Sequence, residues 1–207
     1  MVKLTYEDNQ VLITEIRAWS DDGSLTMCLT KSLVDTNFEY SNADWVVKLV
    51  AWYYHGYLSS ADDAWDVGNA TSIASSVWAK IVDNPSADDT AEVRAAAMTT
   101  WDSVKSKEYP IKAEGLFINL KRGQRAVNLR LDAEQQSGNG SLMRIAPLGA
   151  AFFKQPHIAR LTARENSDST HPSARCGDCC ALYVTLVAAA MNGRHFSSPL
   201  GLMLTGV

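Results

Sequence analysis

The segment SNADWVVKLVAWYYHG, residues 41–56, decides the fold class of this chain. Ser41 and Asp44 have the spacing of a capping box, in which polar side chains bond the free N–H groups of a first helical turn. Gly56 is expected to end the helix, because glycine readily adopts the left-handed conformation found after helix C-termini. Between these signals, apolar residues at helical spacing form one face: Trp45, Val46, Leu49, Val50 and Tyr53. The segment predicts an amphipathic helix packed against a core.

Helical spacing recurs on both sides of this segment. Residues 22–33 carry an apolar stripe made of Leu25, Cys28, Leu29 and Leu33. A second capping signature at residues 86–89 precedes another stripe, which consists of Val93, Ala97, Trp101 and Val104. Pro110 is expected to close that helix, because proline cannot continue the backbone hydrogen-bond pattern.

A long helix is predicted near the end of the chain, opened by Pro172 and Ser173 and ended at residues 192–193. Its apolar face is expected to carry Cys176, Cys179, Cys180, Tyr183, Leu186, Val187, Ala190 and Met191. The three clustered cysteines have no histidine or cysteine pair at zinc-finger spacing beside them. We therefore interpret them as core residues and not as a zinc site.

Strand signals are weak in comparison. Residues 127–131 alternate between apolar and polar side chains, but the run is short and has no evident partner, so it receives little weight. The chain shows no internal repeat and no low-complexity linker. We predict one all-α domain, residues 1–207, folded as a compact helical bundle.

Composition narrows the functional classes. The chain has 207 residues, 46% of them hydrophobic, and a net charge of −4, which gives no general attraction to nucleic acid or to anionic membranes. The longest nearly apolar run, residues 179–191, is too short to span a bilayer. The first eight residues are polar and acidic, unlike a secretory signal. Three of the four cysteines are clustered, which suggests no disulfide framework, so we expect a reducing, cytoplasmic setting without nucleic-acid or membrane partners.

The most informative functional motif is NGSLMR, residues 139–144, preceded by Gly138. Two glycines around Asn139 allow positive φ angles and a close approach of the backbone to a ligand. Glycine-rich turns that lead into helices bind phosphates through free N–H groups. Taken alone, the motif is more often an ordinary turn, since glycine, asparagine and serine all favour turns.

Three further motifs strengthen a functional interpretation of residues 139–144: WSDDGSL at residues 19–25, WDVGNAT at 65–71 and STHP at 169–172. Together and in this order, the four motifs resemble the ADP-ribosylglycohydrolase family, over about residues 19–193. The resemblance implies a compact orthogonal helical bundle. It also implies a hydrolase that cleaves the bond at ribose C1″ of an ADP-ribosylated protein and releases ADP-ribose.

The resemblance assigns a metal site to Ser20, Asp21 and Asp22. In the family, a hydroxyl and two carboxylates at this place help to hold a pair of divalent cations, and Mg²⁺ or Mn²⁺ suits such oxygen ligands. By local chemistry alone, the same residues would more often cap a helix N-terminus.

A second group of residues is assigned to the ribose. The resemblance implies that Asp66 and Gly68 line the ribose pocket, where Asp66 polarises a water molecule or binds a ribose hydroxyl. Asp66 and Asp22 are therefore the catalytic candidates. The alternative for Asp66 is a helix N-cap that follows a loop.

The remaining assignments concern the phosphates and adenosine. Arg144 is interpreted as structural, since the helix of this motif packs centrally in the family. His171 is expected to donate a hydrogen bond to phosphate oxygen. With it, the ligand-binding residues predicted from the resemblance are Asn139, Gly140, Ser141 and Met143.

Two elements of the family pattern are missing from the sequence. The C-terminal Asp-x-Asp-Ser/Thr metal motif is not found, since no acidic residue follows Asp178, and the family's N-terminal helix is not found either. We therefore expect an incomplete fold, shortened at both ends, that holds one cation or none. The alternatives are a non-catalytic relative, either an ADP-ribose-binding protein or a crystallin-like structural protein, and a helical interaction protein.

Overall fold

The structure is a computed structural model that describes residues 4–7, 10–13, 19–83, 119–131 and 137–194. Its helices are α1 (Asp21–Asp35), α2 (Asn42–His55), α3 (Asn69–Asp83), α5 (Leu120–Arg130), α6 (Ala146–Ala151), α7 (Pro156–Asp168) and α8 (Ala174–Met191). Two short strands, β1 (Leu4–Glu7) and β2 (Gln10–Ile13), form an antiparallel hairpin in which Leu4 pairs with Ile13. The helix predicted after residues 86–89 lies outside the described residues.

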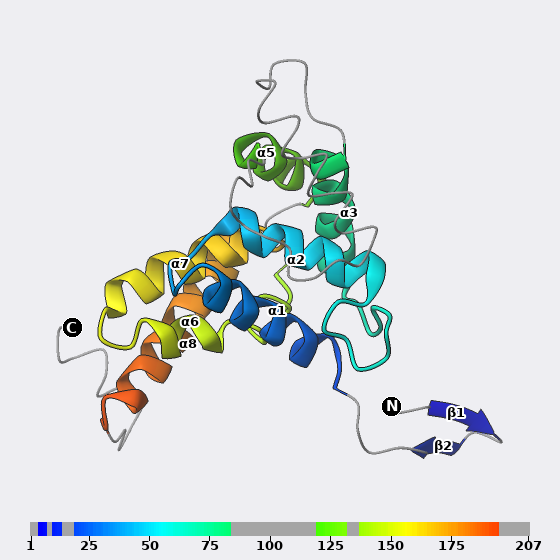
Figure 1. Cartoon of the computed structure of the whole chain (residues 1–207), viewed down its shortest axis with the longest axis horizontal. Coiled ribbons are helices and arrows are strands. Elements are labelled where there is room, and N and C mark those ends of the chain that lie inside the picture. The colour runs from blue at the N-terminus through cyan, green and yellow to red at the C-terminus, as the bar shows by residue number, and fades with distance from the viewer. Residues whose placement is uncertain (1–3, 8–9, 14–18, 84–118, 132–136, 195–207) are drawn as a thin grey trace.

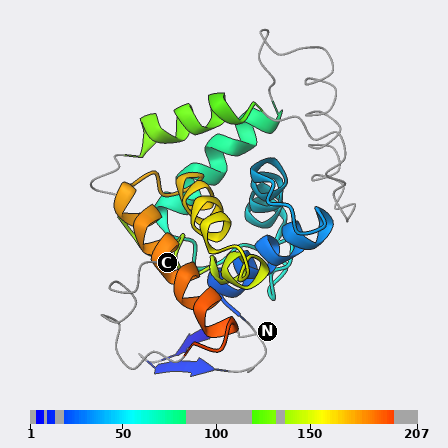
Figure 2. The same ribbon diagram turned by 90° about the vertical axis from the view of Figure 1, so that its left-hand side faces the viewer.

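The predicted all-α fold is confirmed, with the hairpin as a small addition beside the helices (Figure 1). Helix α2 lies in the middle of the bundle and packs against α1, α3 and α7. Helices α6, α7 and α8 pack on one another, and Figure 2 turns this side toward the viewer. Helix α5 packs on α3.

Helix α2 begins and ends as its sequence predicts. Ser41 is the N-cap, and its Oγ accepts a hydrogen bond of 3.3 Å from the backbone N–H of Asp44. Gly56 adopts the left-handed conformation with φ of 65°, which places it after the last helical residue. Because these local signals agree with the tertiary fold, both helix boundaries could be predicted from the sequence.

The core surrounds α2, whose side chains are buried on most of its faces. Trp45 and Trp52 are fully buried, and each such side chain contributes roughly 1.5–3 kcal/mol by leaving water. The helix also buries a charge, Lys48, whose Nζ lies 2.7 Å from Asp44 Oδ2 and 3.0 Å from Asp35 Oδ2. These ion pairs join α2 to the C-terminal turn of α1 and satisfy an ammonium group that would otherwise be costly to bury.

The weak strand signal at residues 127–131 was misleading, because this segment is the last part of α5 and its C-cap. Val127 and Leu131, four residues apart, are buried, whereas Leu129 is 82% exposed. That is the helical period and not the strand period. Helix α5 approaches α3 closely at Gly123, where a Cβ atom would lie 1.9 Å from Cζ3 of Trp78.

The long C-terminal helix exists as α8, but its buried face differs from the predicted one. Cys176 and Cys180 are buried, whereas Cys179 is exposed and Tyr183 is 39% exposed. The residues that face the core are Cys176, Gly177, Cys180, Ala181, Val184 and Ala188. The small residues allow α8 to approach α6 and α7, so the side chains that pack are smaller than those the hydrophobic pattern favoured.

Helix α8 is also longer than the apolar run seen in the sequence. It begins at Ala174, and by length and composition alone its 18 residues could cross a membrane, contrary to the expectation that no segment is long enough. Core helices of soluble proteins pass the same test. In this structure α8 packs against α6 and α7.

Candidate functional site

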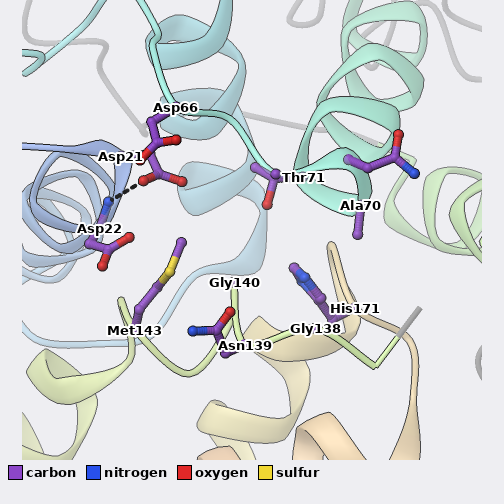
Figure 3. Close-up of a pocket in the computed structure, with 12 residues that line it drawn as sticks. Asp21, Asp22, Asp66, Ala70, Thr71, Gly138, Asn139, Gly140, Met143 and His171 are labelled. Atoms are coloured by element: carbon purple, nitrogen blue, oxygen red, sulfur yellow. Dashed lines mark hydrogen bonds between the residues drawn. The ribbon is translucent and has the colours of Figure 1, made fainter. Parts of the chain in front are cut away.

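A cavity of about 370 Å³ opens between the N-termini of α1 and α3 and the turns that precede α6 and α8. Its volume lies in the range of small-molecule sites. Figure 3 shows three carboxylates at one end and an imidazole ring at the other, with a methionine between them. The lining residues are Asp21, Asp22, Asp66, Gly68, Asn69, Ala70, Thr71, Gly138, Asn139, Gly140, Met143 and His171.

The carboxylates at the acidic end come from two separate segments. Asp21 and Asp22 begin α1, and Oδ1 of Asp21 accepts a hydrogen bond of 3.0 Å from the backbone N–H of Asp22. Asp66 lies in the loop before α3 and has φ of 58°, a left-handed conformation that aspartate tolerates better than most residues. Because α3 begins only at Asn69, the alternative interpretation of Asp66 as its N-cap is wrong.

The acidic end concentrates negative charge in a partly dry place. Asp21 is only 4% exposed, whereas Asp22 and Asp66 face solvent. Burial is the main cause that raises the pKa of Asp21 to about 7, and the neighbouring Asp22 and Asp66 raise it further. A proton or a cation would relieve this repulsion.

At the opposite end, a glycine approaches the imidazole ring closely. A Cβ atom on Gly140 would lie 2.8 Å from Cε1 of His171 and 3.3 Å from Oγ1 of Thr71. The positive φ angles that glycine permits are not adopted in this turn, since among the described glycines only Gly56 and Gly193 have them. Glycine is required at position 140 because of space, not because of backbone conformation.

Helix α3 directs its N-terminus into the same end of the cavity. The first backbone hydrogen bond of α3 joins the N–H of Ser72 to the carbonyl of Gly68. The N–H groups of Asn69, Ala70 and Thr71 therefore have no partner within the helix. Such N–H groups, together with the helix dipole, attract anions. These three residues were not predicted as site residues from the motifs, although Gly68 before a helical run was a usable signal.

The turn that carries the imidazole is anchored by two buried tryptophans. Nε1 of Trp45 donates to Oγ of Ser169 at 3.0 Å, and Nε1 of Trp78 donates to the backbone carbonyl of Ser169 at 2.8 Å. The backbone N–H of His171 donates to the carbonyl of Ser167 at 2.7 Å. His171 is therefore held by α2, α3 and α7, and it is only 3% exposed.

Arg144 connects the turn at Gly140 to the turn that carries His171. Its guanidinium is fully buried and donates to the carbonyl of Gly140 at 3.3 Å, to Asn166 at 3.1 Å and to Oγ1 of Thr170 at 2.8 Å. It also lies 4.7 Å from the ring centre of Trp45. This geometry agrees with the interpretation of Arg144 as a structural residue.

The order of these motifs and their meeting in one cavity match a known family. A sequence model of the ADP-ribosylglycohydrolase family matches residues 5–204. This chain belongs to that family. The match extends beyond the residues 19–193 inferred from the motifs alone.

One curated relative in the family is the ADP-ribosylarginine hydrolase Tri1 of Pseudomonas putida (strain GB-1). It is 26% identical over 178 residues, which make up 84% of this chain and 35% of the relative. The chain therefore spans about a third of that relative's length. No solved structure matches the chain.

The structure brings together most of the site residues predicted from the resemblance to the ADP-ribosylglycohydrolases. Eight of them line the cavity: Asp21, Asp22, Asp66, Gly68, Asn139, Gly140, Met143 and His171. Ser20 is the N-cap of α1 but makes no side-chain capping bond, and it does not line the cavity. Ser141 is 1% exposed, and its Oγ accepts from Oγ of Ser167 at 2.8 Å. Its hydroxyl thus belongs to the core, and the geometry gives no support to a ligand contact.

The acidic end fits a cation only in part. Among the described residues, no group of three or more aspartate, glutamate, histidine or cysteine side chains is arranged to hold a metal ion. Asp21 and Asp22 nevertheless present adjacent carboxylates whose repulsion a cation would relieve, with Asp66 across from them. This donor set suits one hard cation with water in its remaining positions, not the pair implied by the family resemblance.

Proposed function

We propose that this chain binds ADP-ribose in the described cavity and, with a divalent cation, hydrolyses the bond between ribose C1″ and an acceptor side chain. The observation that carries the proposal is the polarity of the cavity. Its two ends, one acidic and one rich in uncharged donors, suit a cation-assisted ribose at one end and a diphosphate at the other.

At the acidic end, Asp21 and Asp22 would hold one Mg²⁺ or Mn²⁺ ion. Such an ion, when bound, supplies Lewis-acid stabilisation of oxygen ligands. Asp66 faces this place from the loop before α3 and would accept a proton from the attacking water or a hydrogen bond from a ribose hydroxyl. The water oxygen forms the new bond to C1″, while the acceptor side chain leaves with its electron pair and takes up a proton.

At the other end, the donors would bind the diphosphate. The free N–H groups at the start of α3, the Asn139 amide and the His171 ring line one surface. Met143 lies between the two ends, where its thioether can pack against a sugar. All these donors are uncharged or partially charged, so orientation, more than net charge, would select the ligand.

The test combines binding and turnover on the full chain. Calorimetric titration with ADP-ribose, with and without Mg²⁺, should give binding that tightens with the cation. A protein ADP-ribosylated on arginine is the first substrate to try, because the relative is named for that linkage. Release of ADP-ribose that needs Mg²⁺ is expected. Absence of both binding and release would overturn the proposal.

A second candidate is a binding protein without catalysis. The observation that favours it is the absence, among the described residues, of a three-ligand metal cluster. In that case ADP-ribose binds equally well with and without Mg²⁺, and no ADP-ribose is released from any modified protein. The same pair of measurements therefore separates the two candidates.

A further inference from the structure

Thr170 lies between a buried cation and the histidine of the cavity. Its Oγ1 is 2.8 Å from Nη2 of Arg144 and 2.9 Å from Nδ1 of His171. Arg144 and Thr170 are fully buried, and His171 is 3% exposed. In so dry a place each donor and acceptor needs a partner, so the direction of each hydrogen bond matters.

The inventory of donors decides those directions. A guanidinium has only donors, so Oγ1 of Thr170 accepts from Arg144. The hydroxyl proton of Thr170 must then find an acceptor, and Nδ1 of His171 is the acceptor that lies within reach among the described residues. If Nδ1 carried a proton instead, the hydroxyl proton would be buried without a partner, at a cost of roughly 1–3 kcal/mol.

The surroundings also disfavour the doubly protonated ring. Burial, and then the positive charge of Arg144, lower the pKa of His171 to about 4. Arg144 forms no ion pair with a carboxylate of the described residues, so its charge acts on the ring unopposed at close range. Other titratable groups also lie near this end. The thiol of Cys176 from α8 donates to the carbonyl of Gly138, Cys180 from α8 and Tyr40 interact with Arg144, and the carboxylates lie across the cavity.

We infer that Arg144 and Thr170 lock His171 in its neutral Nε2–H tautomer, so that the ring presents a permanent, uncharged hydrogen-bond donor to the cavity. Nε2 is the nitrogen on the cavity side, since a Cβ atom on Gly140 would lie 3.0 Å from it and one on Gly138 3.8 Å from it. Thr170 is thus a positioning residue, which acts through the histidine and does not line the cavity.

This assignment sharpens the class of ligand. A fixed N–H donor favours a group that accepts hydrogen bonds, such as a phosphate oxygen, and disfavours a group that can only donate, such as an ammonium or an amide N–H, at the same position. Its strength should stay constant from about pH 5 to about pH 8, the interval in which an ordinary histidine changes charge. The use of the donor in diphosphate binding rests on the function proposed above, whereas the tautomer is a property of the ligand-free protein.

The decisive experiment is a long-range ¹H–¹⁵N correlation spectrum of the ligand-free full chain with ¹⁵N-labelled histidine. The spectrum distinguishes the two neutral tautomers and the imidazolium form. His171→Gln identifies the signals of residue 171 among the four histidines of the chain. The expected pattern is a bare Nδ1 and a protonated Nε2 that stay unchanged from about pH 8 to about pH 5. An Nδ1–H tautomer or an imidazolium in this interval would overturn the inference.

Two variants then test the role of Thr170. Thr170→Val removes the hydroxyl with little change in volume and should abolish the strong preference for Nε2–H, whereas Thr170→Ser should keep the wild-type spectrum. Thr162→Val is the matched control, because the Thr162 hydroxyl bonds only to backbone carbonyls of α7, and it should also leave the spectrum unchanged. An unchanged spectrum in Thr170→Val would contradict the inference. Should Thr170→Val fail to fold, the wild-type and Thr170→Ser spectra still decide the tautomer.

Binding of ADP-ribose gives the functional readout. Thr170→Val should bind about three- to tenfold more weakly than the wild type, and Thr170→Ser within about twofold of it. Equal binding by wild type and Thr170→Val, despite a changed tautomer, would show that the donor is not used. If the wild type binds no ADP-ribose at all, the proposed function fails, while the spectrum still decides the tautomer independently.

Discussion

The two ends of the cavity differ in whether their buried polar groups have partners within the protein. At the acidic end, burial, and then the neighbouring Asp22 and Asp66, raise the pKa of Asp21 to about 7. At the donor end, the polar groups of Arg144, Thr170 and His171 are matched to one another by hydrogen bonds. The buried Arg144–Thr170–His171 chain is therefore paired internally, whereas the acidic end requires a proton or a cation.

The two ends therefore differ in how far the described core alone holds their polar groups in place. The donor end is held by the tryptophans of α2 and α3 and by Arg144, all within the described core. The acidic end offers adjacent carboxylates at one helix N-terminus and a third on a loop. We expect the donor end to bind its ligand with or without metal, and the acidic end to respond to cations.

The largest effect should follow from Asp21→Asn. Removing one of two adjacent carboxylates should abolish the Mg²⁺-dependent gain in ADP-ribose affinity, a loss of at least about tenfold in the presence of the cation. Calorimetry with and without Mg²⁺ measures it. Asp178→Asn, an exposed carboxylate on α8 that pairs with Arg164, is the matched control and should keep the gain. If the affinity of Asp21→Asn for ADP-ribose rises with Mg²⁺ as it does in the wild type, the acidic end is not the part of the cavity that responds to the cation.

Gly140→Ala should damage the other end selectively. The new Cβ atom would lie 2.8 Å from Cε1 of His171, so the ring or the turn must move. We expect metal-free binding of ADP-ribose to weaken about tenfold, while the rise in melting temperature caused by Mg²⁺ persists. Gly177→Ala, whose Cβ atom would lie at an ordinary 3.6 Å from Arg164, should have neither effect. A Mg²⁺ response lost in Gly140→Ala would mean that the two ends are not independent.

The pH dependence of stability should reveal the neutral histidine. The pKa of His171 falls from 6.5 to about 4 on folding, so between these values the unfolded chain binds a proton that the folded chain does not. The contribution of His171 to the free energy of unfolding should therefore fall as the pH falls through this window, by about 1.4 kcal/mol per pH unit.

Comparison with His171→Gln isolates that contribution, because glutamine does not titrate. The raised pKa values of Asp21, Glu165 and Asp168 act in the opposite sense, but both proteins share them. The stability advantage of the wild type over the variant should be full above pH 6.5 and shrink toward pH 4, as measured by urea unfolding. A difference that stays constant with pH would refute the buried neutral ring.

The smallest effect should come from Asp66→Asn. Its carboxylate faces solvent, where charges are screened, so the affinity for Mg²⁺ should fall only about threefold. Isothermal titration with Mg²⁺ alone checks this. A loss as large as that of Asp21→Asn would instead make Asp66 an equal cation ligand and the acidic end a three-carboxylate centre.

Part of the fold followed from local signals. The caps of α2 define both of its ends, and the apolar stripe predicted for residues 22–33 lies on the buried face of α1, whereas no helix was predicted for α3, α6 or α7. Prediction failed where packing selected a different face. Cys179 and Tyr183 fit an apolar stripe, yet α8 turns its small residues inward because the space against α7 and α6 admits little else.

The amino-acid sequence alone revealed which chemical groups the site contains: adjacent aspartates at the start of a helix, a glycine-asparagine turn and a histidine before proline. Which atoms of these groups face the cavity became clear only from the tertiary structure. It turned the Ser141 hydroxyl into the core and brought the start of α3 into the cavity. It also placed Thr170 between Arg144 and His171. The physical reason is that hydrogen-bond directions and burial arise from segments far apart in the chain, and no local pattern encodes them.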